Sequence, residues 1–157
     1  MDNGGIYVVI RHLNVQRERH GAGSLVCSHE CSRRAQDLVN REIAYPGSVI
    51  SAMMNVNGAA CFGQNLAVRV EGISPAAACI RAIDMWQVEQ SHYDFANPGY
   101  SPSSRHFAAN VWRSMTHVGI GVGDGRNGGY TIAAVFYQPT MAPMDFGRNV
   151  LPARSVR

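Results

Sequence analysis

The sequence predicts a single α+β domain, and three observations lead to this fold class. The length of 157 residues and the mass of 17.1 kDa suit one domain. Hydrophobic residues make up 46% of the chain and charged residues 16%, a balance that supports a packed core and excludes a disordered chain. Four segments have the apolar spacing of helices and three alternate as strands do. We expect one domain over residues 1–157, with a core over about 6–139 and a wrapping tail over 140–157.

The first half of the chain is expected to hold two helices and one strand. The first helix runs from about Ile6 to His20, because Gly21 is a helix-stop signal. Ser28 is expected to cap the second helix, which continues to about Glu42 before Tyr45-Pro46-Gly47 breaks it. Irregular chain or a short helix follows over 48–62, and then a strand over Leu66–Val70.

The third helix is expected to open at Ser74-Pro75 and to reach about Gln90. Its apolar residues form one stripe, and the 3.6-residue period puts Glu89 at the edge of that stripe. An unpaired buried carboxylate is costly, so we expect Glu89 to have a partner.

A loop over 94–104 precedes a fourth helix, which Ser104 is expected to cap. This helix covers about Arg105–Arg113, with His106 opposite its buried face and one turn from Asn110. Two strands, His117–Val122 and Tyr130–Tyr137, then form a hairpin. Three glycines at this turn match the G-x-G-x-x-G pattern, but a strand follows them where a dinucleotide site needs a helix, so we interpret them as hairpin glycines: Gly123, Gly125 and Gly128.

Composition excludes several classes of protein. The apolar runs are much shorter than the about 20 residues that span a membrane. No charged-then-apolar leader opens the chain, which predicts a cytoplasmic protein; a leader missing from this sequence would instead indicate an extracellular one. A net charge of +3 is too weak to predict nucleic-acid binding, although all 14 basic residues are arginine, a residue that suits anionic surfaces.

The four cysteines are interpreted as free thiols in a reducing compartment. Cys27 and Cys31 enclose His29 and Glu30 in a C-x-x-x-C pattern. No second pair of cysteines or histidines completes a zinc site, so the pattern does not predict one.

Five short motifs follow one another along the chain. The first four segments are Asn14–Arg17 with His20-Gly21, Gly63-Gln64-Asn65-Leu66-Ala67, Trp86–Glu89 and His106–Trp112 followed by Val118-Gly119-Ile120-Gly121. The fifth is Asn149–Pro152. Together they resemble motifs of the CAP superfamily of cysteine-rich secretory, antigen-5 and class-one pathogenesis-related proteins, and His106–Gly121 resembles its signature H-F-T-x-x-V-W…G-x-G. The last motif is most similar to the Golgi-associated, intracellular branch of the family.

The resemblance implies a three-layer α-β-α sandwich around a central antiparallel sheet. It also implies a cleft that in the family carries two histidines and two glutamates and can bind a divalent metal. Here Glu89 and His106 match one of each, Gln64 replaces the other glutamate, and Met53, Met54 and Asn55 stand near the place of the other histidine. We therefore expect a degenerate cleft with no catalytic residues, no metal and no other cofactor, in which Glu89 and His106 are only weak metal candidates.

Three aromatic residues in the loop, Tyr93, Phe95 and Tyr100, have the spacing of a caveolin-motif-like loop in sterol-binding relatives. Aromatic rings on such a loop can cover a flat apolar ligand. The alternative is that Tyr93 and Phe95 pack the end of the third helix against the core.

The function expected from these observations is non-enzymatic binding of a sterol, another lipid or an anionic membrane surface, including peripheral attachment to Golgi or other membranes. One alternative is a self-associating interaction scaffold, such as a homodimer through the cleft face. A second alternative is a metal-assisted hydrolase that uses Glu89 and His106, against which the glutamine at position 64 counts.

Overall fold

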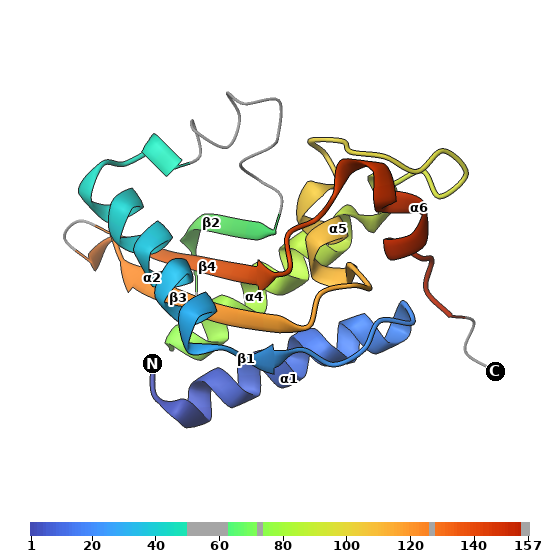
Figure 1. Ribbon diagram of the computed structural model, residues 1–157. Helices are drawn as coiled ribbons and strands as arrows, with labels where there is room; N and C mark the ends of the chain where they lie inside the picture. Colours follow the sequence, from blue (N-terminus) through green and yellow to red (C-terminus); the bar gives the residue numbers. More distant parts are fainter. Residues whose placement is uncertain (50–62, 72–73, 126–127, 155–157) are drawn as a thin grey trace.

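The computed structural model describes residues 1–49, 63–71, 74–125 and 128–154. Its layers are a helix, a sheet and a second layer of helices, so the expected α-β-α sandwich is confirmed (Figure 1). Cys61 and the positions 53–55 lie outside the described residues.

The central sheet has four strands in the order β1-β3-β4-β2. The strands are β1 (Val26–Cys27), β2 (Gln64–Val70), β3 (His117–Asp124) and β4 (Thr131–Gln138). The β3–β4 hairpin is antiparallel from His117↔Gln138 to Asp124↔Thr131, as predicted, and β2 pairs antiparallel with β4. The two-residue strand β1 was not predicted, and it runs parallel to β3 at the edge of the sheet.

One face of the sheet is covered by α2 (His29–Ala44). Ser28 caps this helix as predicted, because its hydroxyl accepts a hydrogen bond from the Cys31 N–H. Alternate glycines on β3 let the helix lie directly on the strand: a Cβ atom at Gly119 would be 2.0 Å from the Cys31 carbonyl carbon.

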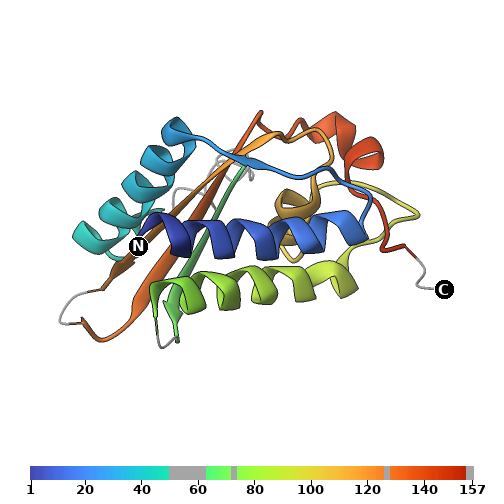
Figure 2. The same cartoon turned by 90° about the horizontal axis from the view of Figure 1, so that it is seen from below.

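The other face is covered by α1 (Asn3–Arg19) and α4 (Pro75–Gln87), which lie side by side, and by α5 (Arg105–Val111) (Figure 2). Ser74 caps α4 as predicted, and a 3-10 helix, η2 (Val88–His92), continues it toward the aromatic loop. The sequence predicted an exposed side of this helix at His106 and Asn110, and this prediction is wrong. Asn110 is fully buried, and all the other α5 residues except His106 are buried too.

The C-terminal segment folds back onto this layer. It forms a 3-10 helix, η4 (Pro143–Asp145), and α6 (Phe146–Asn149). Phe146 packs edge-on against Trp112 at 4.9 Å between ring centroids, and the Asn149 carbonyl accepts a hydrogen bond from the Arg113 N–H. These contacts hold the C-terminal segment against the residues that directly follow α5.

Candidate functional site

The predicted partners Glu89 and His106 form a direct pair. Glu89 Oε2 lies 2.7 Å from His106 Nδ1, and the two side chains are only 21% and 15% exposed. An ionised carboxylate can only accept, so Nδ1 carries the proton and donates it. The pair joins η2 to the first turn of α5.

The second oxygen of the same carboxylate caps α5. Glu89 Oε1 accepts hydrogen bonds from the backbone N–H groups of His106, at 3.1 Å, and Phe107, at 3.2 Å. The N–H groups in the first turn of a helix lack partners within the helix, and the positive end of the helix dipole favours a negative charge. Ser104 occupies the N-cap position but its side chain makes no capping hydrogen bond, so the predicted serine cap is wrong and Glu89 takes that role.

The His106 ring stacks on Trp86, with centroids 5.6 Å apart and an interplanar angle of 15°. Its Nε2 atom is buried and has no hydrogen-bond partner among the described residues. This nitrogen is therefore the one unused polar atom of the pair.

The residues that the structure describes do not fit a metal ion. Zinc takes three or four protein ligands, and the described residues contain no group of three or more histidine, cysteine, aspartate and glutamate side chains that could hold one. Both Glu89 oxygens are already engaged with N–H donors.

Gln64 is not placed beside this pair. It lines a pocket with α2 residues and Phe136, on the other face of the sheet. Neighbouring residues in a strand point to opposite faces, and Asn65 is the one that points toward α5. The Asn65 amide donates to the His106 carbonyl at 3.0 Å and to Asn110 Oδ1 at 3.3 Å.

Asn65 belongs to a buried polar cluster that the sequence analysis missed. Asn110 Oδ1 accepts a second hydrogen bond from the Tyr137 hydroxyl, at 2.6 Å, and the Asn110 amide donates to the Ile83 carbonyl. Burial raises the pKa of Tyr137, which keeps its hydroxyl protonated as a donor. Asn65 and Asn110 both lie in segments that carry the family resemblance, and this was the available signal for their importance.

The aromatic residues of the loop do not stand free of the protein. Tyr93 is 7% exposed and packs against Phe95 and Phe107, with centroids 4.8 and 5.9 Å away. Phe95 and Tyr100 are partly buried against the same core. The packing alternative therefore describes Tyr93 and Phe95, while a role for this loop in sterol binding stays a prediction.

Cys27, Cys31 and Cys79 are free thiols in this structure. Cys27 is exposed, whereas Cys31 and Cys79 are buried, and burial raises the pKa of both buried thiols.

Comparison with known sequences identifies the family. Residues 10–138 match the profile described as the cysteine-rich secretory protein family, or CAP. The chain belongs to this family.

The chain is similar to two curated relatives of different length. Repressed by EFG1 protein 1 of Candida albicans is 33% identical over 112 residues, which are 71% of this chain and 37% of that protein. Golgi-associated plant pathogenesis-related protein 1 of Homo sapiens is 25% identical over 148 residues, which are 93% of this chain and 92% of that protein.

The chain spans about two-fifths of the length of its two fungal relatives. It covers 37% of Repressed by EFG1 protein 1 and 40% of protein PRY2 of Saccharomyces cerevisiae.

Solved structures support the fold. Venom allergen-like protein 4 of Schistosoma mansoni superposes with a TM-score of 0.66 at 15% identity, covering 99% of this chain and 97% of that one. The hookworm platelet inhibitor gives a TM-score of 0.67 at 15% identity, covering 90% and 72% of the two chains.

Proposed function

We propose that this CAP protein is a non-enzymatic lipid-binding module that attaches to anionic membrane surfaces. The observation that carries the proposal is the exposed outer face of the α1–α4 helix pair. Within the described part of the chain, no helix is both long and apolar enough to cross a bilayer.

The outer face combines apolar and cationic side chains. On α1, Val8 and Val15 lie seven residues apart and hence on one side of the helix, and both are exposed. Met85 on α4 and Val88, the first residue of η2, are exposed, and Arg81 lies one turn before Met85. A surface with aliphatic side chains beside an arginine suits anionic lipid, because the aliphatic groups enter the interface while an arginine contributes about 1 kcal/mol near the surface.

A side-chain hydrogen bond links the two helices. His12 Nε2 donates to Asp84 Oδ1 across the helix pair, at 2.7 Å. This contact joins the middle of α1 to the C-terminal half of α4.

The candidate cleft supports a non-catalytic function. The Glu89 carboxylate accepts three hydrogen bonds, which tie together η2 and α5. A general base needs a carboxylate or imidazole within reach of a substrate proton, and this carboxylate is occupied by the fold itself. We assign the pair a structural role.

Sterol binding near Phe95 and Tyr100 remains part of the proposal. Because Tyr93 is in the core, the half-buried rings of Phe95 and Tyr100 are the ones that we expect to contact a sterol. Attachment to Golgi membranes is proposed by analogy with the human relative, whose name describes it as Golgi-associated.

Cosedimentation with liposomes tests the membrane proposal. We expect binding to phosphatidylcholine vesicles that contain phosphatidylserine and not to pure phosphatidylcholine, with weaker binding at higher salt as counterions screen the arginines. Arg81→Glu should weaken binding about fivefold or more, because it removes one attractive charge and adds a repulsive one. Met85→Ser should weaken it by removing an apolar contact.

The matched control is Tyr45→Ser, which changes an exposed aromatic residue at the C-terminal end of α2, on the other side of the sheet. It should leave vesicle binding unchanged. Light scattering over a dilution series tests the homodimer alternative. If Arg81→Glu and Met85→Ser dissociate a dimer and no vesicles bind, the face is a subunit interface and the proposal is wrong.

A further inference from the structure

One edge of the central sheet is only partly covered. Strand β3 has eight residues, whereas β1 has two and pairs with His117 and Val118 alone. The chain then turns into α2, so β1 lies beside only the first part of β3 (Figure 1). Among the described residues, no strand pairs with the rest of β3 on that side. An edge strand of this kind presents backbone donors and acceptors to which another strand can pair.

Alternate residues of β3 present their backbone groups at this edge. Val118 faces β1, since its carbonyl accepts a hydrogen bond from the Ser28 N–H at 2.9 Å. Backbone groups two residues apart in a strand point the same way, so Ile120, Val122 and Asp124 face the same edge. No backbone group of another described residue pairs with these residues there. The uncovered edge therefore offers an N–H and a carbonyl group at each of these positions.

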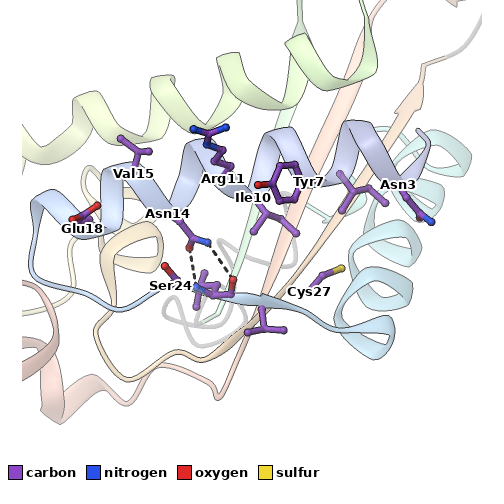
Figure 3. A pocket seen from close by; sticks show the side chains of 12 residues that line it. Asn3, Tyr7, Ile10, Arg11, Asn14, Val15, Glu18, Ser24 and Cys27 are labelled. Carbon is purple, nitrogen blue, oxygen red and sulfur yellow. Dashed lines mark hydrogen bonds between the residues drawn. The ribbon is translucent and has the colours of Figure 1, made fainter.

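A side-chain amide occupies the middle of this edge. Gln36 Oε1 accepts a hydrogen bond from the Val122 N–H, and Gln36 Nε2 donates to the Val122 carbonyl, both at 3.2 Å. Asn14 pairs in the same way with the backbone of Leu25, just before β1, at 2.8 and 3.2 Å (Figure 3). In both places an amide stands where the peptide group of a neighbouring strand would lie. Because a side chain can rotate away, Gln36 marks a position that a strand can take.

A groove of about 400 Å³ runs along the uncovered edge, between α1 and α2. Ile120 forms its floor, because this residue lines the groove and is only 5% exposed. His29 and Arg33 are exposed and form its rim on the α2 side. We call it the β3-edge groove, and its defining residues are Ile6, Arg33, Gln36, Asp37, Ile120 and Val122.

The depth of the groove favours a single extended chain over a second copy of the protein. In a pair of copies, each β3 edge would lie below its own α1 and α2. The helices of the two copies would then meet before the strands came within about 4.8 Å, the spacing of paired strands. An isolated strand has no flanking helices and can reach the floor of the groove.

The side chains of such a strand would alternate between the two walls of the groove. On one side, Ile120 belongs to the core beside α1, and Ile6 and Val122 pack against this core. On the other side, Gly119 and Gly121 face α2, which approaches them too closely for a Cβ atom. One wall is therefore apolar, and the other follows α2.

The α2 wall carries one charge of each sign. Arg33 and Asp37 line the groove four residues apart, on one side of the helix. Neither side chain has a hydrogen-bond or ion-pair partner among the described residues. Helix α2 runs in the same direction as β3, because its first turn lies against Gly119 and its second against Gly121. Arg33 is therefore nearer to the start of β3 than Asp37 is.

We propose that the β3-edge groove binds an extended peptide segment of another protein, which adds to the sheet as a strand antiparallel to β3. This is the recognition mode of domains that bind peptides by strand addition. The peptide backbone displaces the Gln36 amide from Val122 and also pairs with Ile120 and Asp124. The site is separate from the outer face of α1 and α4 and goes beyond the proposed membrane attachment.

The charges of the groove specify three side chains of the peptide. An apolar residue lies opposite Val122 and contacts Ile6 on the α1 side. In a strand antiparallel to β3, the residue before it faces Asp37 and is basic, and the residue after it faces Arg33 and is acidic. The expected pattern is therefore basic, apolar, acidic.

Fluorescence anisotropy with a labelled peptide of sequence Thr-Thr-Lys-Val-Glu-Thr-Thr tests the proposal. We expect saturable binding of one peptide per chain. N-methylation of the peptide's valine should weaken binding about tenfold or more, because this N–H donates to the Val122 carbonyl and a methyl group also blocks the approach of the strand. N-methylation of the peptide's glutamate is the matched control and should leave binding unchanged, since that N–H points away from β3.

Protein variants test the residues of the groove. Gln36→Ala should strengthen binding about threefold or more, because the amide no longer competes for Val122. Arg33→Glu should weaken binding of the same peptide about threefold or more, and should improve binding of a peptide whose glutamate is replaced by lysine. Arg41→Glu, at an exposed position of α2 outside the groove, is the matched control and should bind both peptides as the unmodified protein does.

Hydrogen exchange measured by NMR gives a second readout. In the free protein, the amide of Ile120 should exchange faster than that of Gly121, which faces β4. The bound peptide should slow exchange at Ile120 and Asp124 and leave Gly121 unchanged.

Several results would overturn the proposal. Equal binding of the two N-methylated peptides would mean that the peptide does not pair with β3. Binding that is insensitive to both Gln36→Ala and Arg33→Glu would place the peptide elsewhere. Absence of peptide binding also refutes the proposal, and self-association of Gln36→Ala in light scattering would then assign the edge to a second copy. The membrane proposal is tested separately, because vesicle binding is expected to depend on Arg81 and Met85.

Discussion

At the scale of single residues, His20 links folding to pH. The ring is buried, its Nδ1 donates to the Leu151 carbonyl at 2.8 Å, and its Nε2 lies 2.9 Å from the Gln87 amide nitrogen. Burial lowers the pKa of His20, the Arg19 charge adds to this, and the hydrogen bond to Leu151 opposes it. The unfolded chain therefore binds a proton more tightly than the folded protein does. We expect stability to be complete above about pH 6.5 and to fall as pH drops from there toward the lowered pKa.

The measurement is the free energy of urea unfolding between pH 7.5 and pH 5. His20→Asn keeps a donor for the Leu151 carbonyl but does not titrate, so its stability should depend less on pH than that of the unmodified protein. His29→Asn changes an exposed histidine at the start of α2 and should retain the original dependence. If the two variants have the same pH profile, His20 is not the responsible group.

The residues of the site show what sequence reasoning can and cannot reach. The pairing of Glu89 followed from physical necessity, since a carboxylate at the edge of an apolar stripe needs a partner. The placement of Gln64 in the cleft came only from the resemblance. The strand register puts it on the α2 face, and no periodicity in a five-residue motif decides which of two neighbours points inward.

At the scale of secondary-structure elements, the contact between α2 and β3 depends on glycine. A Cβ at Gly119 would lie 2.0 Å from backbone atoms of Cys31 and Ser32, and neither helix nor strand backbone can yield as a flexible side chain does. We expect Gly119→Ala to lower the free energy of unfolding by about 3 kcal/mol or more, at or beyond the upper end for overpacked cores. Chemical denaturation measures this loss.

Gly99→Ala is the matched control, because a Cβ there meets no atom within 4 Å. It should change stability by no more than about 0.5 kcal/mol. Equal stability of the two variants would contradict direct packing of α2 on β3.

The elements with strong periodicity were predicted and the short ones were not. The α2 helix carries its buried residues at helical spacing, and its serine cap and Tyr45-Pro46-Gly47 end were readable from the sequence. The two residues of β1 have no pattern of their own, since their pairing comes from the neighbouring β3. The cap of α5 was mispredicted because the accepting carboxylate, Glu89 in η2, is 17 and 18 residues away in sequence from the two N–H groups that it caps.

At the scale of the whole molecule, Arg17 joins parts of the chain that are far apart in sequence. Its side chain is completely buried, and burial lowers its pKa to about 10, so it remains charged at neutral pH. The guanidinium donates to four backbone carbonyls, those of Gly23, Asn110, Trp112 and Met115. One side chain on α1 thus fixes the loop before β1 and the segment after α5. The fourfold pattern was invisible in the sequence, where Arg17 is one arginine among 14 basic residues.

Replacing Arg17 should therefore destabilise the whole fold. Arg17→Lys keeps the positive charge, but the lysine ammonium has three N–H donors and lacks the planar geometry of the guanidinium. At least one of the four buried carbonyls therefore loses its hydrogen bond. We expect the free energy of unfolding to fall by about 2–4 kcal/mol, measured by urea denaturation at neutral pH. Arg33→Lys, at an exposed position on α2, should change it by no more than about 0.5 kcal/mol. Similar losses in the two variants would mean that positive charge alone, and not the array of four hydrogen bonds, is what the fold requires at position 17.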